Sequence, residues 1–430
     1  MSSSPFRPEL LAPAGNLSKL KVALRYGADA VYLGGPTLNL RAGAGGFGQE
    51  VLAQAVELAR IADVRVYYCL NAFPLEADLD SVRNTLEMLG CMPHDSRVDG
   101  LIVADPGVFA LARKFLPDMP LHVSTQANTG NSAAVGFWRD LGAKRVNLAR
   151  ELTLKDIRGV RRAVSERAPG MELEMFVHGA MCLALSGRCS LSAHLNARSA
   201  NKGGCTQPCR FAYRPRALAL TVEEQLRPGD VLWEVLEGED FTAFFSPRDL
   251  CLVKYLPWLQ RNGVNALKIE GRMRSAAYVA LTCDVYRTAL EDLGRGSYSP
   301  DRYLRELGAA LHRPMDSGFF LPGAPAMTAK RWECGGDMTM VGHLLRQDGP
   351  GRWTTQVLDR WEATGPVELV LPGLRRPVLR PGEYGLENER GDAMCLAHPG
   401  QRVVLCCEHP ECGSDIFLRQ IQDRTRKQPR

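Results

Sequence analysis

The stretch that decides the fold is residues 9–33, ELLAPAGNLSKLKVALRYGADAVYL. Its opening apolar run, ELLA, is typical of a short buried strand, and the following Pro-Ala-Gly ends it. A helix is predicted next, because Leu17, Leu20 and Leu24 recur on one face at helical spacing. Gly27 then stands where a helix commonly ends in a left-handed residue, and the run AVYL predicts a second strand. The stretch is therefore a strand–helix–strand unit.

The same junction, a glycine followed by an apolar run, recurs at 142–146 and 263–267. Strands are predicted at 9–12, 30–33, 64–70, 99–103, 121–124, 145–149, 173–177 and 266–270, and helices at 49–62, 78–90, 106–116, 131–141, 154–167 and 247–261. Alternating strands and helices imply a parallel sheet covered by helices. Eight units favour a (β/α)8 TIM-like barrel. An open doubly wound sheet is the alternative, because closure is not visible in a sequence.

A long insertion, residues 178–246, separates the seventh and eighth strands. It is rich in cysteine and contains one predicted strand, Val231–Val235. At its end Ser246 is a candidate N-cap and Pro247 suits a first helical turn, which predicts a helix over 247–261. Cys251 would then lie near a helix N-terminus, where a thiolate is favoured.

Two domains are expected. Residues 1–330 would form the barrel together with its insertion, and residues 331–430 a small all-β domain resembling a barrel. The second domain is predicted from short apolar runs at 355–358, 367–371 and 402–405, separated by Pro-Gly turns.

Composition restricts the function classes. The chain has 430 residues, 45% of them hydrophobic, and no apolar window near the roughly 18 residues of a membrane span. It opens without the features of a signal peptide, so a cytoplasmic location is expected. In that reducing compartment, clusters among the 13 cysteines would bind metal or perform chemistry rather than form disulfides. The net charge of +5 permits a nucleic-acid partner without requiring one.

Five cysteines are candidate metal ligands: Cys182, Cys189, Cys205, Cys209 and Cys251. Four thiolates suit either a tetrahedral zinc ion or an iron–sulfur cluster. The wide spacings favour a cluster, since structural zinc usually takes tight CxxC pairs; inert packing is the third alternative. A second group, Cys406–Cys412 with Cys395 and His398, is a weaker metal candidate. Hydrolase, P-loop and dinucleotide motifs are absent, and a cysteine peptidase would need His178 beside Cys182.

Polar residues follow the predicted strands. Since the active site of such a barrel lies at the carboxyl ends of its strands, these side chains are expected to line a pocket. They are Asn16, Asn39, Arg41, Asn71, Asp105, Gln126, Asn128, Arg150, Glu151, His178, Glu270 and Arg272. The alternative is that strand ends are polar simply because they meet solvent.

Several motifs resemble the collagenase-like peptidase U32 family. They are ELLAPAG at 9–15, GADAVY at 27–32, HGAMC at 178–182, SGRCSLS at 186–192, GCTQPCR at 204–210, SPRDLC at 246–251 and LKIEGRM at 267–273. The resemblance spans about residues 9–320. It implies a barrel with a 4Fe–4S cluster held by Cys182, Cys189, Cys205 and Cys251, with Cys209 in reserve.

The resemblance also implies a reaction. Several members of the family are hydroxylases that work without molecular oxygen on tRNA wobble uridine, on a 23S rRNA cytidine or on ubiquinone precursors. The RNA-modifying branch uses prephenate as hydroxyl source. A barrel with a small β domain is similar to the branch that forms 5-hydroxyuridine in tRNA. A peptidase and a zinc-stabilised RNA-binding protein are the alternatives from other classes.

Roles follow from position. Arg41, Arg150 and Arg272 are expected to bind the carboxylates of the donor. His178, Glu151 and Glu270 are the candidates for proton transfer. Asn71, Gln126 and Asn128 are expected to contact substrate.

Overall fold

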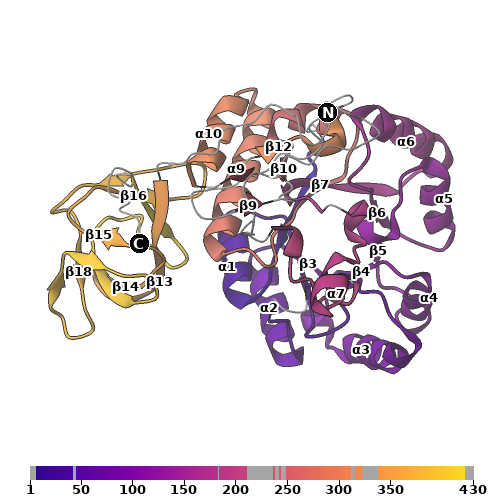
Figure 1. Cartoon of the computed structure of the whole chain (residues 1–430), viewed down its shortest axis with the longest axis horizontal. Coiled ribbons are helices and arrows are strands. Elements are labelled where there is room, and N and C mark those ends of the chain that lie inside the picture. The colour runs from indigo at the N-terminus through magenta and orange to yellow at the C-terminus, as the bar shows by residue number, and fades with distance from the viewer. Residues whose placement is uncertain are drawn as a thin grey trace.

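The computed structural model describes residues 6–41, 45–182, 184–210, 236–237, 242–243, 248–310, 315–321 and 338–421. Figure 1 shows a helix-covered barrel with a smaller β domain beside it. The predicted strand Val231–Val235, the proposed cap at Ser246 and Pro247, and the predicted domain boundary at 330 all lie outside the described residues.

Eight parallel strands close into a barrel. They are β1 (Glu9–Pro13), β2 (Ala30–Gly34), β3 (Arg65–Leu70), β4 (Gly100–Val103), β5 (Leu121–Val123), β6 (Arg145–Asn147), β7 (Glu172–Ala180) and β11 (Ala266–Ile269). Each pairs in parallel with the next, and β11 pairs with both β7 and β1, which closes the ring. The predicted (β/α)8 barrel is confirmed, and the open sheet is excluded.

Helices cover the outside of the barrel. They are α1 (Leu17–Arg25), α2 (Gln49–Ile61), α3 (Leu79–Cys91), α4 (Pro106–Phe115), α5 (Ser132–Asp140), α6 (Leu154–Arg167), α8 (Leu256–Arg261) and α9 (Ala276–Arg295). Side chains of Asn16, Asp105, Asn131, Thr153 and Ser275 accept backbone N–H groups at helix starts. Within the described part of the chain, no helix has the length and apolar character needed to cross a membrane.

The recurring glycine junction is confirmed. Gly27, Gly142 and Gly263 have φ angles of 85°, 93° and 66°, in the left-handed region that glycine adopts at little cost. At Gly27 an added Cβ would also lie 2.8 Å from the side chain of Arg287. These residues turn the chain from a helix back into the following strand.

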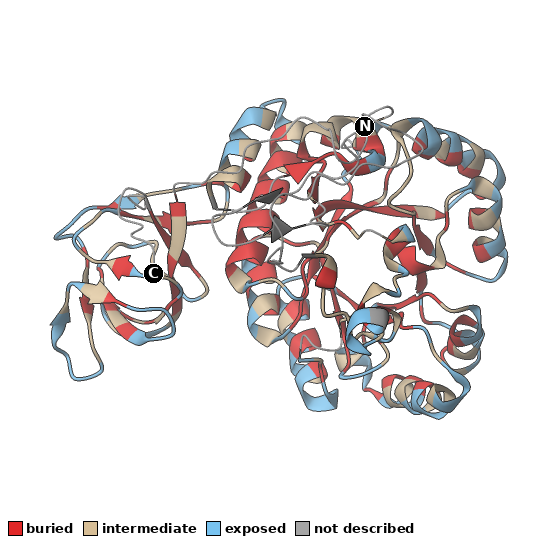
Figure 2. Cartoon of the chain, in the orientation of Figure 1, coloured by how far each residue is buried: buried red, intermediate tan, exposed pale blue. Residues whose placement is uncertain are grey.

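The core lies mainly between the strands and the helices, as the red segments in Figure 2 show. The interior of the barrel also contains charged side chains from β1, β6, β7 and β11, which are buried and neutralise one another. Arg145 contacts Glu9 at 2.6 Å and Glu174 at 3.4 Å, and Lys268 contacts Glu174 at 2.9 Å. These buried charges therefore compensate one another inside the barrel.

The predicted helix over 247–261 is wrong at its start. Residues Asp249–Cys251 form strand β10, which runs antiparallel to the end of β7 and parallel to β12 (Met315–Asp316). The end of β7 extends beyond its pairings with β6 and β11 and offers backbone partners, and burial of Leu250 and Cys251 favours the extended form. Helix α8 begins only at Leu256, so Cys251 gains no stabilisation from a helix N-terminus.

The C-terminal domain is an antiparallel β structure, as predicted. Its main strands are β13 (Met338–Gly349), β14 (Arg352–Val357), β16 (Val367–Val370), β17 (Val378–Leu379), β18 (Gly385–Glu387), β19 (Ala393–Met394), β21 (Arg402–Cys406) and β22 (Phe417–Ile421), with a separate pair β15 (Trp361–Glu362) and β20 (Leu396–Ala397). The domain has its own apolar core around the buried Trp361.

The two domains are joined by buried ion pairs. Asp284 of α9 accepts hydrogen bonds from Arg376 at 2.7 Å and from the backbone of Gly373 at 2.7 Å. Glu306 of α10 (Pro300–Ala310) binds Arg376 at 3.1 Å and Arg419 at 3.0 Å. The β domain is therefore docked on α9 and α10.

Candidate functional site

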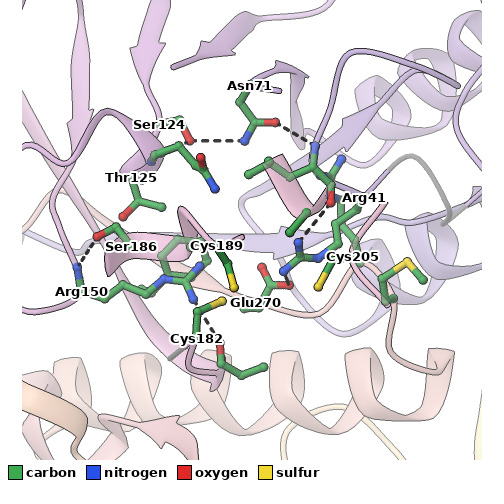
Figure 3. Close-up of a pocket in the computed structure, with 18 of the residues that line it drawn as sticks. Arg41, Asn71, Ser124, Thr125, Arg150, Cys182, Ser186, Cys189, Cys205 and Glu270 are labelled. Carbon is green, nitrogen blue, oxygen red and sulfur yellow. Dashed lines mark hydrogen bonds and ion pairs between the residues drawn. The ribbon is translucent and has the colours of Figure 1, made fainter. Parts of the chain in front are cut away.

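A cavity of about 520 Å³ opens at the carboxyl ends of the barrel strands, where the fold predicts an active site. Ten of the predicted site residues line it: Arg41, Asn71, Gln126, Arg150, Cys182, Cys189, Cys205, Cys209, Glu270 and Arg272. Figure 3 shows Cys182, Cys189 and Cys205 together with Arg41 and Glu270. The structure thus brings four cysteines from the insertion to one cavity.

Two hydrogen bonds hold the loop between Cys182 and Cys189, the cysteine loop. The Nε atom of Arg188 donates to the backbone oxygen of Gln126 at 2.8 Å, and Asn128 donates to the backbone oxygen of Leu185 at 3.4 Å. Asn128 itself does not line the cavity. Its role in the structure is to fix the loop between Cys182 and Cys189.

Glu151 also binds this loop rather than the cavity. Its carboxylate accepts from the backbone N–H of Ser186 at 2.5 Å and from the Ser186 hydroxyl at 2.6 Å. Ser186 has a φ of 44°, a left-handed conformation that a serine adopts only when its surroundings impose it. Glu151 therefore positions the cysteine loop, and the expected proton-transfer role gains no geometric support.

Positive charge dominates the cavity. Its described lining has five arginines and one lysine against a single carboxylate, Glu270. Arg41 binds Glu270 at 3.1 Å. Burial alone would raise the pKa of Glu270, but Arg41, Arg150 and Arg272 outweigh it and lower the pKa to about 2. Glu270 is thus a fixed anion that holds the arginines together, and it is poorly suited to carry a proton near neutral pH.

Arg150 and Arg272 are held by aromatic rings. The Arg150 guanidinium lies 3.9 Å from the centre of the Phe176 ring and donates to the backbone oxygen of Ala180 at 3.0 Å. Arg272 lies 5.7 Å from the centre of the Tyr32 ring. Gly34 makes room for it, because a Cβ there would approach the Arg272 guanidinium to 2.8 Å. Both cations are preorganised for an anionic ligand.

The charge on Glu270 predicts a pH dependence of stability. The pKa of Glu270 is lower in the folded protein than in the unfolded chain, so its contribution is complete above about pH 4.5 and falls as pH drops toward 2. We expect the difference in unfolding free energy between wild type and Glu270→Gln to be about 2 kcal/mol smaller at pH 3 than at pH 6. Urea unfolding of both proteins at several pH values measures this difference. A constant difference would contradict the assignment.

His178 does not line the cavity, contrary to expectation. The register between β7 and β11 shifts by one residue between the Phe176 and His178 pairings, and this bulge turns the His178 ring away from the interior. The ring packs against Tyr278 and Tyr286 of α9, and burial, followed by Arg274, lowers its pKa to about 3. His178 is therefore neutral and enclosed.

Cys251 is also placed away from the cavity. It is fully buried on β10, and its sulfur lies 3.8 Å from the Tyr286 hydroxyl. Cys209, the reserve ligand, lines the cavity instead. Within the described residues, no three His, Cys, Asp or Glu side chains lie close enough to hold a single metal ion. The cavity lining thus contains four cysteines, Cys182, Cys189, Cys205 and Cys209.

Some cavity residues were not predicted, among them Ser124, Asn147, Arg198 and Lys268. Ser124 follows β5 directly, so the strand-end rule could have found it. Arg198 lies in the insertion, where no strand marks its position.

The sequence pattern of peptidase family U32 matches residues 15–329. This chain belongs to peptidase family U32. The U32 match contains all ten predicted residues that line the cavity and ends before the β domain.

Individual U32 relatives extend the comparison. The chain is 36% identical to tRNA hydroxylation protein P of Escherichia coli over 99% of both chains. It is 39% identical to tRNA hydroxylation protein P1 of Bacillus subtilis over 73% of this chain and 71% of that one. The 23S rRNA 5-hydroxycytidine C2501 synthase of Escherichia coli is 32% identical over 69% of this chain and 42% of its own.

Proposed function

We propose that this protein hydroxylates tRNA. The observation behind the proposal is the similarity to tRNA hydroxylation protein P of Escherichia coli, which covers 99% of both chains and so includes both domains of this one. The rRNA enzyme is matched over less than half of its length, so the shared architecture favours tRNA over rRNA. The finer proposal is that the product is 5-hydroxyuridine at the wobble position.

The donor set of the cavity fits a 4Fe–4S cluster. Cys182, Cys189, Cys205 and Cys209 share one cavity, and arginines around them would offset the negative charge of a thiolate-bound cluster. The absence of a compact three-ligand group among the described residues argues against one zinc ion. A bound cluster would supply electron transfer. We propose Cys209 as the fourth ligand, in place of Cys251.

The arginines then have a defined task. Arg150 and Arg272 are fixed over aromatic rings and face the cavity, where they can bind the carboxylates of a small donor such as prephenate. Arg41 forms an ion pair with Glu270 and adds to the positive charge of the cavity lining. To enter this cavity, the target base must unstack from its neighbours in the RNA, as in other base-modifying enzymes.

A peptidase is less well supported. A cysteine nucleophile needs a histidine in hydrogen-bond reach, and among the described residues no histidine lines the cavity. His178, the candidate partner of Cys182, is enclosed behind the barrel wall.

The proposed function is tested by mass spectrometry of nucleosides from tRNA of a strain that lacks this protein. We expect 5-hydroxyuridine and its derivatives to disappear and to return when the wild-type chain is supplied. Unchanged 5-hydroxyuridine would reject the wobble-uridine proposal. Loss of a 5-hydroxycytidine from 23S rRNA instead would assign the protein to rRNA.

An exposed aromatic ring beside the cavity predicts a contact with RNA. Phe73 follows β3 and is 57% exposed, and its backbone N–H donates to the Asn201 backbone oxygen at 2.8 Å. Asn201 also accepts from the Cys189 N–H, so Phe73 is fixed beside the cysteine loop. Because a stacked base contributes about 1–3 kcal/mol, Phe73→Ala is expected to weaken tRNA binding about tenfold.

Fluorescence anisotropy with labelled tRNA at constant salt measures this effect. Phe73→Tyr should bind like wild type. Phe137→Ala is the matched control, since Phe137 is 54% exposed on α5 in the outer layer of helices. Equal affinities for wild type and Phe73→Ala would exclude the stacking role.

A further inference from the structure

Two cysteines of the β domain lie together outside the cavity. Cys407 follows β21, and Cys412 ends a tight turn five residues later. The Cys412 thiol donates to the Cys407 sulfur, with 3.8 Å between the sulfur atoms. They belong to the Cys406–Cys412 group that the sequence marks as a weak metal candidate.

The backbone fixes this pair. The Cys407 N–H donates to the Gly351 oxygen at 2.7 Å, which anchors it to the turn between β13 and β14. The Cys412 N–H donates to the His409 oxygen at 3.0 Å, and Pro410 occupies the turn position that proline favours. The turn therefore returns Cys412 onto Cys407.

The neighbouring Cys406 has a different environment. It is the last residue of β21, and its sulfur lies 3.6 Å from the Arg352 guanidinium. Burial raises the pKa of Cys406, whereas the hydrogen bond from Cys412 lowers the pKa of Cys407 to about 7. A lowered pKa favours the reactive thiolate. Of the two adjacent cysteines, Cys407 has the lowered pKa and a second thiol within reach; its side chain is buried, whereas that of Cys412 is partly exposed.

We propose that Cys407 and Cys412 form a redox-active dithiol that closes to a disulfide when it meets a low-molecular-weight disulfide. A metal site at this position lacks support, because in the described part of the chain no third His, Cys, Asp or Glu joins the pair to hold an ion. The inference is independent of the tRNA proposal.

The chemistry is a two-step thiol–disulfide exchange. The Cys407 thiolate attacks the small disulfide, forms a mixed disulfide and releases one small thiolate. The Cys412 sulfur then loses its proton and attacks the Cys407 sulfur, which releases the second small thiol. Two protein thiols are oxidised, and one small disulfide is reduced to two thiols.

The disulfide would close a loop that faces the barrel. Glu411 of this loop pairs with Arg375, the neighbour of the interface residue Arg376. At Gly413 an added Cβ would lie 2.8 Å from the Arg25 guanidinium of α1. The pair is therefore positioned to respond to redox conditions where the two domains meet.

The test uses the full chain, reduced and then equilibrated with mixtures of glutathione and glutathione disulfide. After acid quenching and alkylation, trypsin releases one peptide, residues 403–419, with Cys406, Cys407 and Cys412. The reduced peptide carries three alkyl groups. We expect the oxidised peptide to carry one alkyl group, on Cys406, and an internal disulfide, which makes it about 2 Da lighter than the same singly alkylated peptide with two free thiols.

Two variants complete the test. Cys406→Ser should form the disulfide like wild type, whereas Cys412→Ser should form none. In the wild-type chain, full alkylation at every glutathione ratio, an alkyl label that remains on Cys407 or Cys412 at the most oxidising ratio, or a stable glutathione adduct on Cys407 would each overturn the proposal. Zinc that co-purifies with the chain and is lost in Cys407→Ser would overturn it as well.

Discussion

Replacing Asp284 with alanine is expected to lower the free energy of unfolding by about 3 kcal/mol. The Asp284 carboxylate is 1% exposed and joins Arg376 to two backbone N–H groups of the β domain. Its removal leaves the buried Arg376 with Glu306 as its one charged partner among the residues that the structure describes, and it leaves the N–H groups of Gly373 and Leu374 without their acceptor. Urea unfolding followed by circular dichroism measures the loss.

Two controls separate the interface from a general effect of charge. Asp284→Asn keeps an oxygen for the two backbone N–H groups, so it should cost less than Asp284→Ala. Asp140→Ala removes an exposed partner of Arg139 and should change stability by less than about 0.5 kcal/mol. Equal stability of Asp284→Ala and Asp140→Ala would show that the interdomain pairs contribute nothing.

Replacing Cys182 with alanine is expected to abolish both iron binding and tRNA hydroxylation. A 4Fe–4S cluster needs four thiolates, and an alanine leaves one iron without its ligand. Iron and sulfide are measured after anaerobic purification, and tRNA nucleosides are measured in a deletion strain that carries the variant. A colourless wild-type protein that holds one zinc ion would reject the cluster.

The fourth ligand is decided by two further variants. Cys209 lines the cavity, whereas Cys251 is buried on β10 beside Tyr286. Cys209→Ala should therefore lose iron and Cys251→Ala should retain it. The opposite result would restore the ligand set that the family resemblance implies, and it would require β10 to move toward the cavity.

The barrel could be predicted because its signals are local. Parallel strands are buried on both faces and leave continuous apolar runs, and Gly27, Gly142 and Gly263 mark where helices end. The wrong prediction of a helix at Asp249–Cys251 also came from a local signal. Ser-Pro-Arg-Asp resembles a helix start, but Asp249–Cys251 pair with the end of β7, which lies about 70 residues earlier.

The candidate site was predicted less completely, because its details depend on tertiary contacts. The bulge that turns His178 away leaves no sequence pattern. Glu151 follows a strand like the cavity residues, yet it binds a loop 35 residues later. Asp284 reads as an ordinary polar residue of a helix until Arg376, 92 residues further on, lies against it.

The ion pairs between the barrel and the β domain have a consequence for dividing the chain in expression work. A fragment that ends before β13 would expose Asp284 and Glu306 without their arginines, and it would uncover Tyr26, whose hydroxyl donates to the Val370 oxygen at 2.6 Å. A β domain produced alone would expose Phe417, which is fully buried in the intact chain. The two domains are distinct in architecture, but each supplies part of the other's interior.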